Sequence, residues 1–174
     1  TGAVHNPAGI DVKALSQHVE KSGGVVGFES AGPIDPADLL VQVCDVLVPA
    51  ALERVITSKN AGQLKCRVLA EAANGPTTTN ADAILEQRDD IFMIPDILCN
   101  AGGVTVSYFE WVQNLQRFQW SEQEVLTKLD TMMAKAFDRV VNFAQRNALP
   151  HRVAALALGI NEVANVKKQR GLFP

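Results

Sequence analysis

The sequence has little cysteine, and its three cysteines, Cys44, Cys66 and Cys99, form no C-x-x-C pair. An odd number without that spacing argues against a disulfide framework and against a zinc site. The three histidines share no metal-ligand spacing either. We therefore expect three free, buried thiols, no metal, and a cytoplasmic location, where thiols stay reduced.

The sequence also lacks a concentrated positive charge and a long apolar run. Its net charge is −3, and its only basic cluster is Lys167, Lys168 and Arg170, where the dipole of a helix C-terminus favours cations. This argues against a nucleic-acid partner. The longest mostly apolar stretch, residues 153–160, is far too short to cross a bilayer. We expect no membrane partner.

A third absence concerns catalysis. No Ser/His/Asp or Cys/His arrangement can be argued, so we assign no catalytic residue to this chain. The phosphate-binding turn G-x-G-x-x-G is missing as well, because the pairs Gly23-Gly24 and Gly102-Gly103 have the wrong spacing to replace it.

What is present is an alternation of short apolar runs with longer helical ones, which predicts βα units and a largely parallel sheet. The predicted strands, residues 45–49, 67–71 and 91–94, are continuous and apolar, as strands covered on both faces are. A short extended piece is predicted at 25–28. Helices are predicted at residues 11–21, 36–43, 57–64, 80–87, 102–116, 121–146 and 151–169. We expect residues 1–120 to form a Rossmann-type unit and 121–174 a helical segment of the same domain.

Small and amide-bearing residues follow the three predicted strands. Ligands of open parallel sheets bind beyond the carboxyl ends of the strands, where this sequence has Ala50-Ala51, then Asn74, then Asn100 before Gly102-Gly103. Amide N–H groups at such a helix start suit an anion, and Ser107 lies about one turn further along. Simpler interpretations remain open: a helix cap for Asn74, close packing for the glycines, and a solvated hydroxyl for Ser107. Asp96 is best interpreted as a structural hydrogen-bond acceptor.

Four segments, residues 6–11, 44–51, 70–78 and 95–111, closely resemble the C-terminal domain of the glutamate/leucine/phenylalanine/valine dehydrogenase family, and residues 107–111 favour its glutamate branch. The resemblance covers essentially the whole chain. It implies a partial Rossmann-like, doubly wound α/β sheet whose first strands are missing, followed by long C-terminal helices. It also implies reversible oxidative deamination of glutamate to 2-oxoglutarate and ammonia, with NAD or NADP as cofactor.

The resemblance also implies roles for individual residues. It places Val104 and Ser107 at the small-molecule substrate, with the serine hydroxyl near the side-chain carboxylate of glutamate. The residues that it places at the cofactor are Ala50, Ala51, Asn74 and Asn100.

The departures from the family pattern limit this interpretation. The family's catalytic lysine and aspartate, its glycine turn and the residue that selects NAD over NADP have no counterpart in these 174 residues. We therefore expect a fragment that is inactive alone, leaves a sheet edge unpaired, and belongs to a parent that forms a homo-hexamer. Two alternatives stay open: a non-catalytic nucleotide-binding or assembly module, and a fragment of a related leucine, phenylalanine or valine dehydrogenase.

Overall fold

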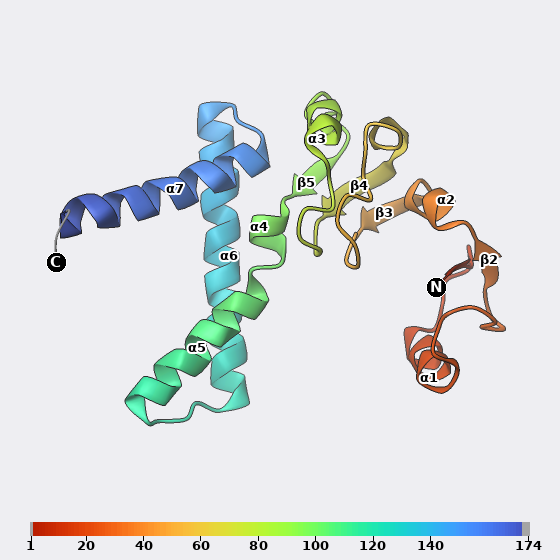
Figure 1. Ribbon diagram of the computed structural model, residues 1–174, viewed down its shortest axis with the longest axis horizontal. Coiled ribbons are helices and arrows are strands. Elements are labelled where there is room, and N and C mark those ends of the chain that lie inside the picture. The colour runs from red at the N-terminus through yellow and green to blue at the C-terminus, as the bar shows by residue number, and fades with distance from the viewer. Residues whose placement is uncertain (1, 172–174) are drawn as a thin grey trace.

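The computed structural model describes residues 2–171, so the last residues of the predicted helical segment lie outside it. The chain forms an arch of three parts, with a small N-terminal unit, a central sheet and an arm of long helices (Figure 1). The C-terminal helices make up the largest part, and the two chain ends lie on opposite sides of the sheet.

The N-terminal unit pairs two strands that the sequence did not predict. Strands β1 (Ala3–His5) and β2 (Gly32–Ile34) are antiparallel, with Val4 opposite Pro33. Between them lies helix α1 (Val12–Ser22). The predicted extended piece at 25–28 is wrong, because these residues form bends and turns that carry the chain back from α1 to β2.

The limits of α1 agree with its capping residues. The Asp11 carboxylate accepts the backbone N–H groups of Lys13 and Ala14 at 2.9 and 3.0 Å, which satisfies two amides at the helix start. Gly23 ends the helix with a φ of 78°, a left-handed conformation that costs glycine little. At the next helix, α2 (Pro36–Leu40), Asp35 caps Ala37 and proline occupies the first turn.

The central sheet has three parallel strands in the order β3-β4-β5, with bounds β3 (Val43–Leu47), β4 (Lys65–Ala70) and β5 (Phe92–Ile94). The prediction of three parallel strands is confirmed, although β3 and β4 each begin two residues earlier than expected. Parallel pairing brings the carboxyl ends of all three strands to one edge of the sheet, which is the edge where the amide-bearing loops lie.

The first of two hydrophobic cores lies under this sheet. It contains the fully buried Leu69 and Ile56 and packs against α3 (Thr79–Leu85). The helix predicted at 57–64 is reduced to a single 3-10 turn, η1 (Ala61–Gln63). The reason is backbone pairing, because Ile56 donates to the Pro76 carbonyl at 2.9 Å and accepts from Thr78 at 2.9 Å. This bridge holds Ile56 itself, and residues 58–60 form a turn before η1.

The second core joins the C-terminal helices to the sheet. Leu98 of the short helix α4 (Asp96–Cys99) packs with Val140 and Ala154, which belong to the long helices α6 (Glu122–Asn147) and α7 (His151–Arg170). Helix α5 (Gly102–Gln116) lies alongside α6. The predicted capping box is confirmed: the Glu124 carboxylate accepts the Ser121 backbone N–H at 2.7 Å, and the Ser121 hydroxyl accepts the Glu124 N–H.

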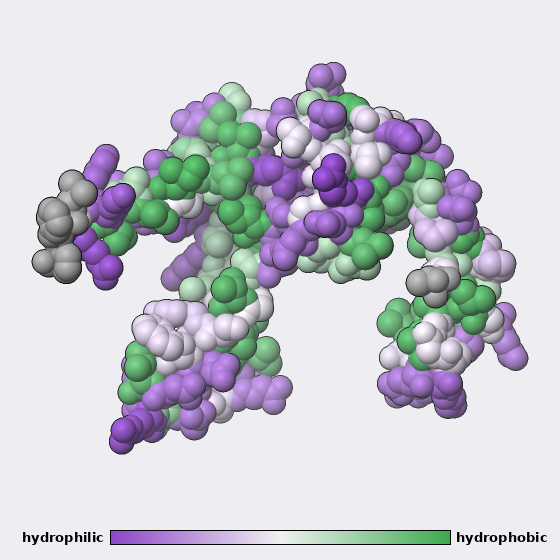
Figure 2. All heavy atoms as spheres, in the orientation of Figure 1, coloured by the Kyte–Doolittle hydropathy of each residue, from purple (hydrophilic) through white to green (hydrophobic). Residues whose placement is uncertain are grey.

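Strand β3 lies at an edge of the sheet and carries exposed apolar side chains. Val43 is 80% exposed, Val46 is about half exposed, and so is Val48, which directly follows the strand. Hydrophobic residues also reach the surface of the helical arm (Figure 2), where Ile160 and Val163 of α7 are among the exposed residues. Within residues 2–171, no helix combines the length and the hydropathy that crossing a membrane requires.

The cysteines are free thiols, as predicted. Only Cys66 is buried, whereas Cys44 and Cys99 are half-buried. Burial raises the pKa of all three thiols, so they stay protonated at neutral pH.

Candidate functional site

Three loops meet at the carboxyl edge of the sheet, one after each strand. The first two are joined by the backbone, because the Ala73 N–H donates to the Pro49 carbonyl at 2.8 Å. The second and third are joined by side chains of Asn74, Asn100 and Asp96. The edge predicted to bind a ligand is therefore one connected surface.

The two predicted amide side chains are in direct contact. Asn100 Nδ2 donates to Asn74 Oδ1 at 2.7 Å, although the residues are 26 positions apart in the chain. Asn74 does not cap a helix, because α3 begins at the cap residue Thr78. The simpler interpretation of Asn74 as a cap is thus wrong, and we call Asn74 and Asn100 the amide pair.

The amide pair retains hydrogen-bonding capacity. Among the described residues, Asn100 Oδ1 and Asn74 Nδ2 make no hydrogen bond. Asn74 is exposed and Asn100 is half-buried. The pair therefore presents one acceptor and one donor to a ligand, the combination that a primary carboxamide or a ribose hydroxyl can match.

The other predicted site residues are exposed in two separate segments, the loop after β3 and the start of α5. Ala50 and Ala51 follow β3, and their methyl side chains leave the backbone of this loop and of the neighbouring loop at Ala73 accessible. Val104 is 70% exposed on α5, and Ser107 is exposed one turn later. Within residues 2–171, no hydrogen bond joins Ser107 to the amide pair, so the structure does not bring these two groups together directly.

The predicted loop between β5 and α5 contains a helical turn of its own. Helix α4 places Asn100 at its C-terminus, where the Asn100 N–H donates to the Asp96 carbonyl at 3.1 Å. Ala101 has helical dihedral angles, and its N–H donates to Leu98. The first backbone bond into α5 runs from the Thr105 N–H to the Ala101 carbonyl at 3.0 Å. The N–H groups of Gly102, Gly103 and Val104 therefore have no partner within the helix, as in the first turn of any helix.

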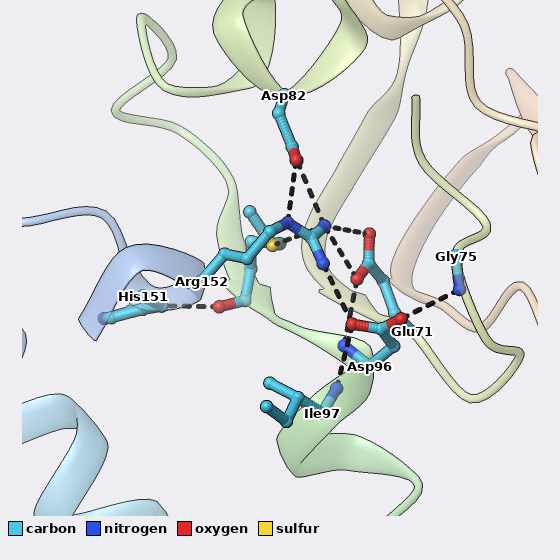
Figure 3. A network of polar contacts seen from close by, with 8 residues as sticks. Glu71, Gly75, Asp82, Asp96, Ile97, His151 and Arg152 are labelled. Carbon is cyan, nitrogen blue, oxygen red and sulfur yellow. Dashed lines mark hydrogen bonds and ion pairs between the residues drawn. The ribbon is translucent and has the colours of Figure 1, made fainter. Parts of the chain in front are cut away.

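An ion network lies directly behind the loops, centred on Arg152 at the start of α7 (Figure 3). The Arg152 guanidinium contacts three carboxylates: Glu71 at 2.7 Å, Asp82 at 2.7 Å and Asp96 at 3.0 Å. Glu71 is completely buried, and the other three side chains are at most 22% exposed. The network joins the ends of β4 and β5 to α3 and α7.

Asp96 links this network to the loop that carries Asn74. Its Oδ2 accepts the Gly75 backbone N–H at 2.8 Å, and its Oδ1 accepts the Ile97 N–H at 2.8 Å as well as the Arg152 guanidinium. The prediction that Asp96 is a structural acceptor is confirmed. Glu71 in turn accepts the Asp96 N–H at 3.0 Å, which fixes the start of α4.

Electrostatics keep Arg152 charged and oppose the charge on Asp82. Burial acts to lower the pKa of Arg152, but hydrogen bonds and attraction from Glu71 and Asp82 raise it above its ordinary value. Burial raises the pKa of Asp82, with smaller contributions in the same direction from Glu71 and Asp96, while Arg152 acts to lower it. Arg152 is therefore the cation that allows three carboxylates to share a buried region.

Three members of this network, Glu71, Asp82 and Arg152, were not predicted from the sequence. One signal was available, because Arg152 is a cation in the first turn of a helix, where the dipole disfavours positive charge. Such a residue indicates a compensating anion nearby. Which carboxylates supply the compensation could not be found from the sequence, since they lie 56 to 81 residues away.

The fold is a Rossmann-like domain of the dehydrogenase class. It has a parallel sheet, long C-terminal helices, and loops at the carboxyl ends of the strands, where such sheets bind ligands. The sequence pattern of the Glutamate/Leucine/Phenylalanine/Valine dehydrogenase family matches residues 1–171. The chain belongs to this family.

Individual relatives are glutamate dehydrogenases. The chain is 45% identical to the glutamate dehydrogenase of Thermotoga maritima over 173 residues, which are 99% of this chain and 41% of the relative. Its structure resembles the hetero-hexameric, leucine-bound glutamate dehydrogenase of Thermus thermophilus with a TM-score of 0.91 and 31% identity, covering 100% of this chain and 41% of that one. For the glutamate dehydrogenase of Peptoniphilus asaccharolyticus the TM-score is 0.78 and the identity 37%, over 97% of this chain and 37% of that one. The chain thus spans about two-fifths of the length of these relatives.

Proposed function

We propose that this chain supplies the nicotinamide-nucleotide-binding surface of an NAD(P)-dependent glutamate dehydrogenase. The observation that carries the proposal is the amide pair at the carboxyl edge of a parallel sheet, in a chain that is similar to glutamate dehydrogenases along its full length. When bound, the nicotinamide ring accepts the hydride from the α-carbon of glutamate. The chain's own contribution is to hold the reactants in place.

The residues present fit this cofactor. Asn100 Oδ1 and Asn74 Nδ2 would bind the carboxamide of the nicotinamide and the adjoining ribose, since both ligand groups need one donor and one acceptor. Ala50 and Ala51 would allow the nucleotide to approach the backbone. Val104 and Ser107, both exposed on α5, would contact the substrate, with the hydroxyl donating to the distal carboxylate of glutamate.

The proposal extends to the whole protein. In it, residues 1–120 form the nucleotide-binding unit and 121–174 a helical segment of the same domain. The catalytic residues lie outside the 174-residue chain, which has no turnover alone. In this proposal the complete protein is a cytoplasmic homo-hexamer. The hetero-hexameric relative from Thermus thermophilus supports an assembly of six subunits. The exposed apolar edge of β3 supports contact with another polypeptide segment.

The direct experiment measures glutamate-dependent reduction of NAD and of NADP by absorbance at 340 nm, with the protein expressed at its natural length. We expect turnover with one or both nucleotides and none with residues 1–174 alone. Leucine, phenylalanine and valine are tested as competing substrates. Nucleotide binding without turnover on any amino acid would instead support a non-catalytic module, and a preference for a competing substrate would overturn the assignment to glutamate.

A side-chain variant tests the role of the amide pair. Asn100→Ala removes one ligand contact and the bond to Asn74, each a neutral hydrogen bond worth about 1 kcal/mol. We expect the KM for the nucleotide to rise by about 5-fold from the ligand contact alone, and by up to about 30-fold if the loss of the bond to Asn74 also weakens binding. Asn142→Ala, at an exposed position of α6, is the matched control and should leave KM unchanged. Equal KM values for the two variants would contradict the assigned contact.

A further inference from the structure

We infer that Arg152 is a positioning residue for the amide pair, acting through Asp96 and Gly75. This inference rests on the proposed function for its consequence in turnover. Its structural part stands on the ion network alone. Within residues 2–171, Arg152 makes no hydrogen bond to Asn74 or Asn100; it holds the residues that fix the distance between the loops after β4 and β5.

The first step is the contact between Arg152 and Asp96. Nη1 of Arg152 donates to Asp96 Oδ1 at 3.0 Å, and Nη2 donates to both carboxylate oxygens of Glu71 at 2.7 and 2.8 Å. Glu71 also accepts the Asp96 N–H. The backbone N–H of Asp96 is therefore held by Glu71, and its side chain is held by Arg152. Because Arg152 also holds Glu71, both contacts of Asp96 depend on the guanidinium.

The second step runs from Asp96 to the amide pair. Asp96 Oδ2 accepts the Gly75 N–H at 2.8 Å, and Gly75 directly follows Asn74. Gly75 has a φ of 55°, a conformation that this hydrogen bond helps to hold. On the other side, α4 begins at Asp96 and ends one residue before Asn100. Asp96 thus connects the backbones that carry both members of the pair.

The shape of the guanidinium fixes the directions of these contacts. An arginine offers several donors in a planar fork, so a single side chain can bind three carboxylates in fixed directions. A lysine would supply the charge without the fork. If Arg152 served only to neutralise Glu71, lysine would replace it fully; if it positions Asp96, lysine would restore folding better than it restores the spacing of the loops.

The experiment compares Arg152→Lys and Arg152→Met with the surface control Arg139→Met, in the protein at its natural length. Arg139 pairs with Glu162 at 2.6 Å, and both side chains are about 60% exposed. Measurements are made well below the unfolding transition of each variant. A displacement of about 1 Å in a binding group costs up to about 100-fold in rate, so we expect kcat/KM to fall 10- to 100-fold for Arg152→Lys and to be unchanged for Arg139→Met.

A second readout does not require activity. Amide hydrogen exchange followed by mass spectrometry should show faster exchange in residues 72–78 for Arg152→Lys, with the peptide over β4 unchanged. Should the Arg152→Lys protein not fold, Asp96→Asn tests the same link, because it weakens acceptance of the Gly75 N–H while leaving Arg152 with Glu71 and Asp82.

The outcomes separate the two proposals. A wild-type protein without turnover on glutamate overturns the proposed function, while faster exchange confined to residues 72–78 would still support the positioning role. Wild-type kcat and KM in a folded Arg152→Lys protein, or a uniform increase in exchange across the whole chain, would overturn the positioning role even if the enzyme activity is found.

Discussion

Replacing Arg152 by methionine should destabilise the protein strongly. The substitution keeps most of the apolar stem but removes the cation from a site that is 18% exposed. Glu71, which is fully buried, then keeps one hydrogen-bond donor among residues 2–171, the Asp96 N–H. Asp82 and Asp96 lose their cation as well. Three carboxylates therefore remain together in a region that excludes most water.

The magnitude follows from the general behaviour of buried ion pairs. Breaking such a pair by removing one partner costs about 3–5 kcal/mol, because the remaining charge stays buried. With a urea dependence of about 2 kcal/mol per molar, the midpoint of unfolding should fall by about 2 M. Arg139→Met, which breaks an exposed pair, should cost less than about 1 kcal/mol.

The pH dependence gives a sharper test. Burial already raises the pKa of Asp82, and Arg152 partly offsets this rise. Without Arg152 the folded-state pKa of Asp82 rises further above its unfolded value. A carboxyl whose folded pKa is raised destabilises the protein above that pKa, and the penalty disappears as pH falls below the unfolded value. The loss caused by Arg152→Met should therefore be full at pH 7 and smaller at pH 4.

The assay is urea denaturation followed by tryptophan fluorescence and circular dichroism at both pH values. Two results would refute the reasoning. One is a loss below about 1 kcal/mol at pH 7, which would mean that the buried carboxylates find other partners or water. The other is a loss that grows in acid, because the sign would then be opposite to that of an unpaired buried carboxylate.

Three further predictions concern other parts of the fold. Leu69→Ala, at a fully buried position of the first core, should cost about 2–5 kcal/mol in thermal or urea unfolding, whereas Val46→Ala on the exposed edge should cost much less. Ser121→Ala should cost about 1 kcal/mol in urea unfolding by removing the side-chain cap of α6. The pKa of Glu124 is lowered first by the Ser121 backbone N–H, which the variant keeps, and then by the Ser121 hydroxyl, which it loses. The contribution of the hydroxyl through Glu124 is therefore present above pH 4.5 and lost as pH falls through the lowered folded-state value. The 174-residue chain alone should self-associate through the edge of β3, and Val46→Lys should reduce the association; light scattering that shows a stable wild-type monomer would count against this interface.

Much of the fold could be predicted because its signals are local. The three parallel strands follow from continuous apolar runs, and the starts of α1, α2 and α6 follow from Asp11, Asp35 and Ser121, whose side chains cap nearby amides. The failures are also physical. The pairing of β1 with β2 joins Ala3 to Ile34, and the bridge between Ile56 and Thr77 is followed by a turn and the 3-10 turn η1 where a helix was predicted. Both depend on contacts distant in sequence.

The candidate site divides in the same way. Asn74 and Asn100 were found because amide side chains follow consecutive predicted strands, and parallel pairing brings those strand ends together. Their direct hydrogen bond was not predictable, because it depends on α4 turning Asn100 back toward Asn74. Arg152 was missed because its partners come from three other elements, and nothing near position 152 identifies them.

The long sequence separations in the ion network bear on how the chain reaches its fold. Glu71 lies 81 residues before Arg152, so during synthesis from the N-terminus the carboxylate is made well before its cation. Until Arg152 has been made, burial of the unpaired Glu71 carboxylate at the end of β4 is unfavourable, and this carboxylate is more stable in water. Closing so large a loop is entropically costly and is repaid only by non-local contacts. We therefore expect Glu71 to become buried only when α7 docks against the sheet. A chain that ends before residue 152 should leave the Glu71 carboxylate exposed to water.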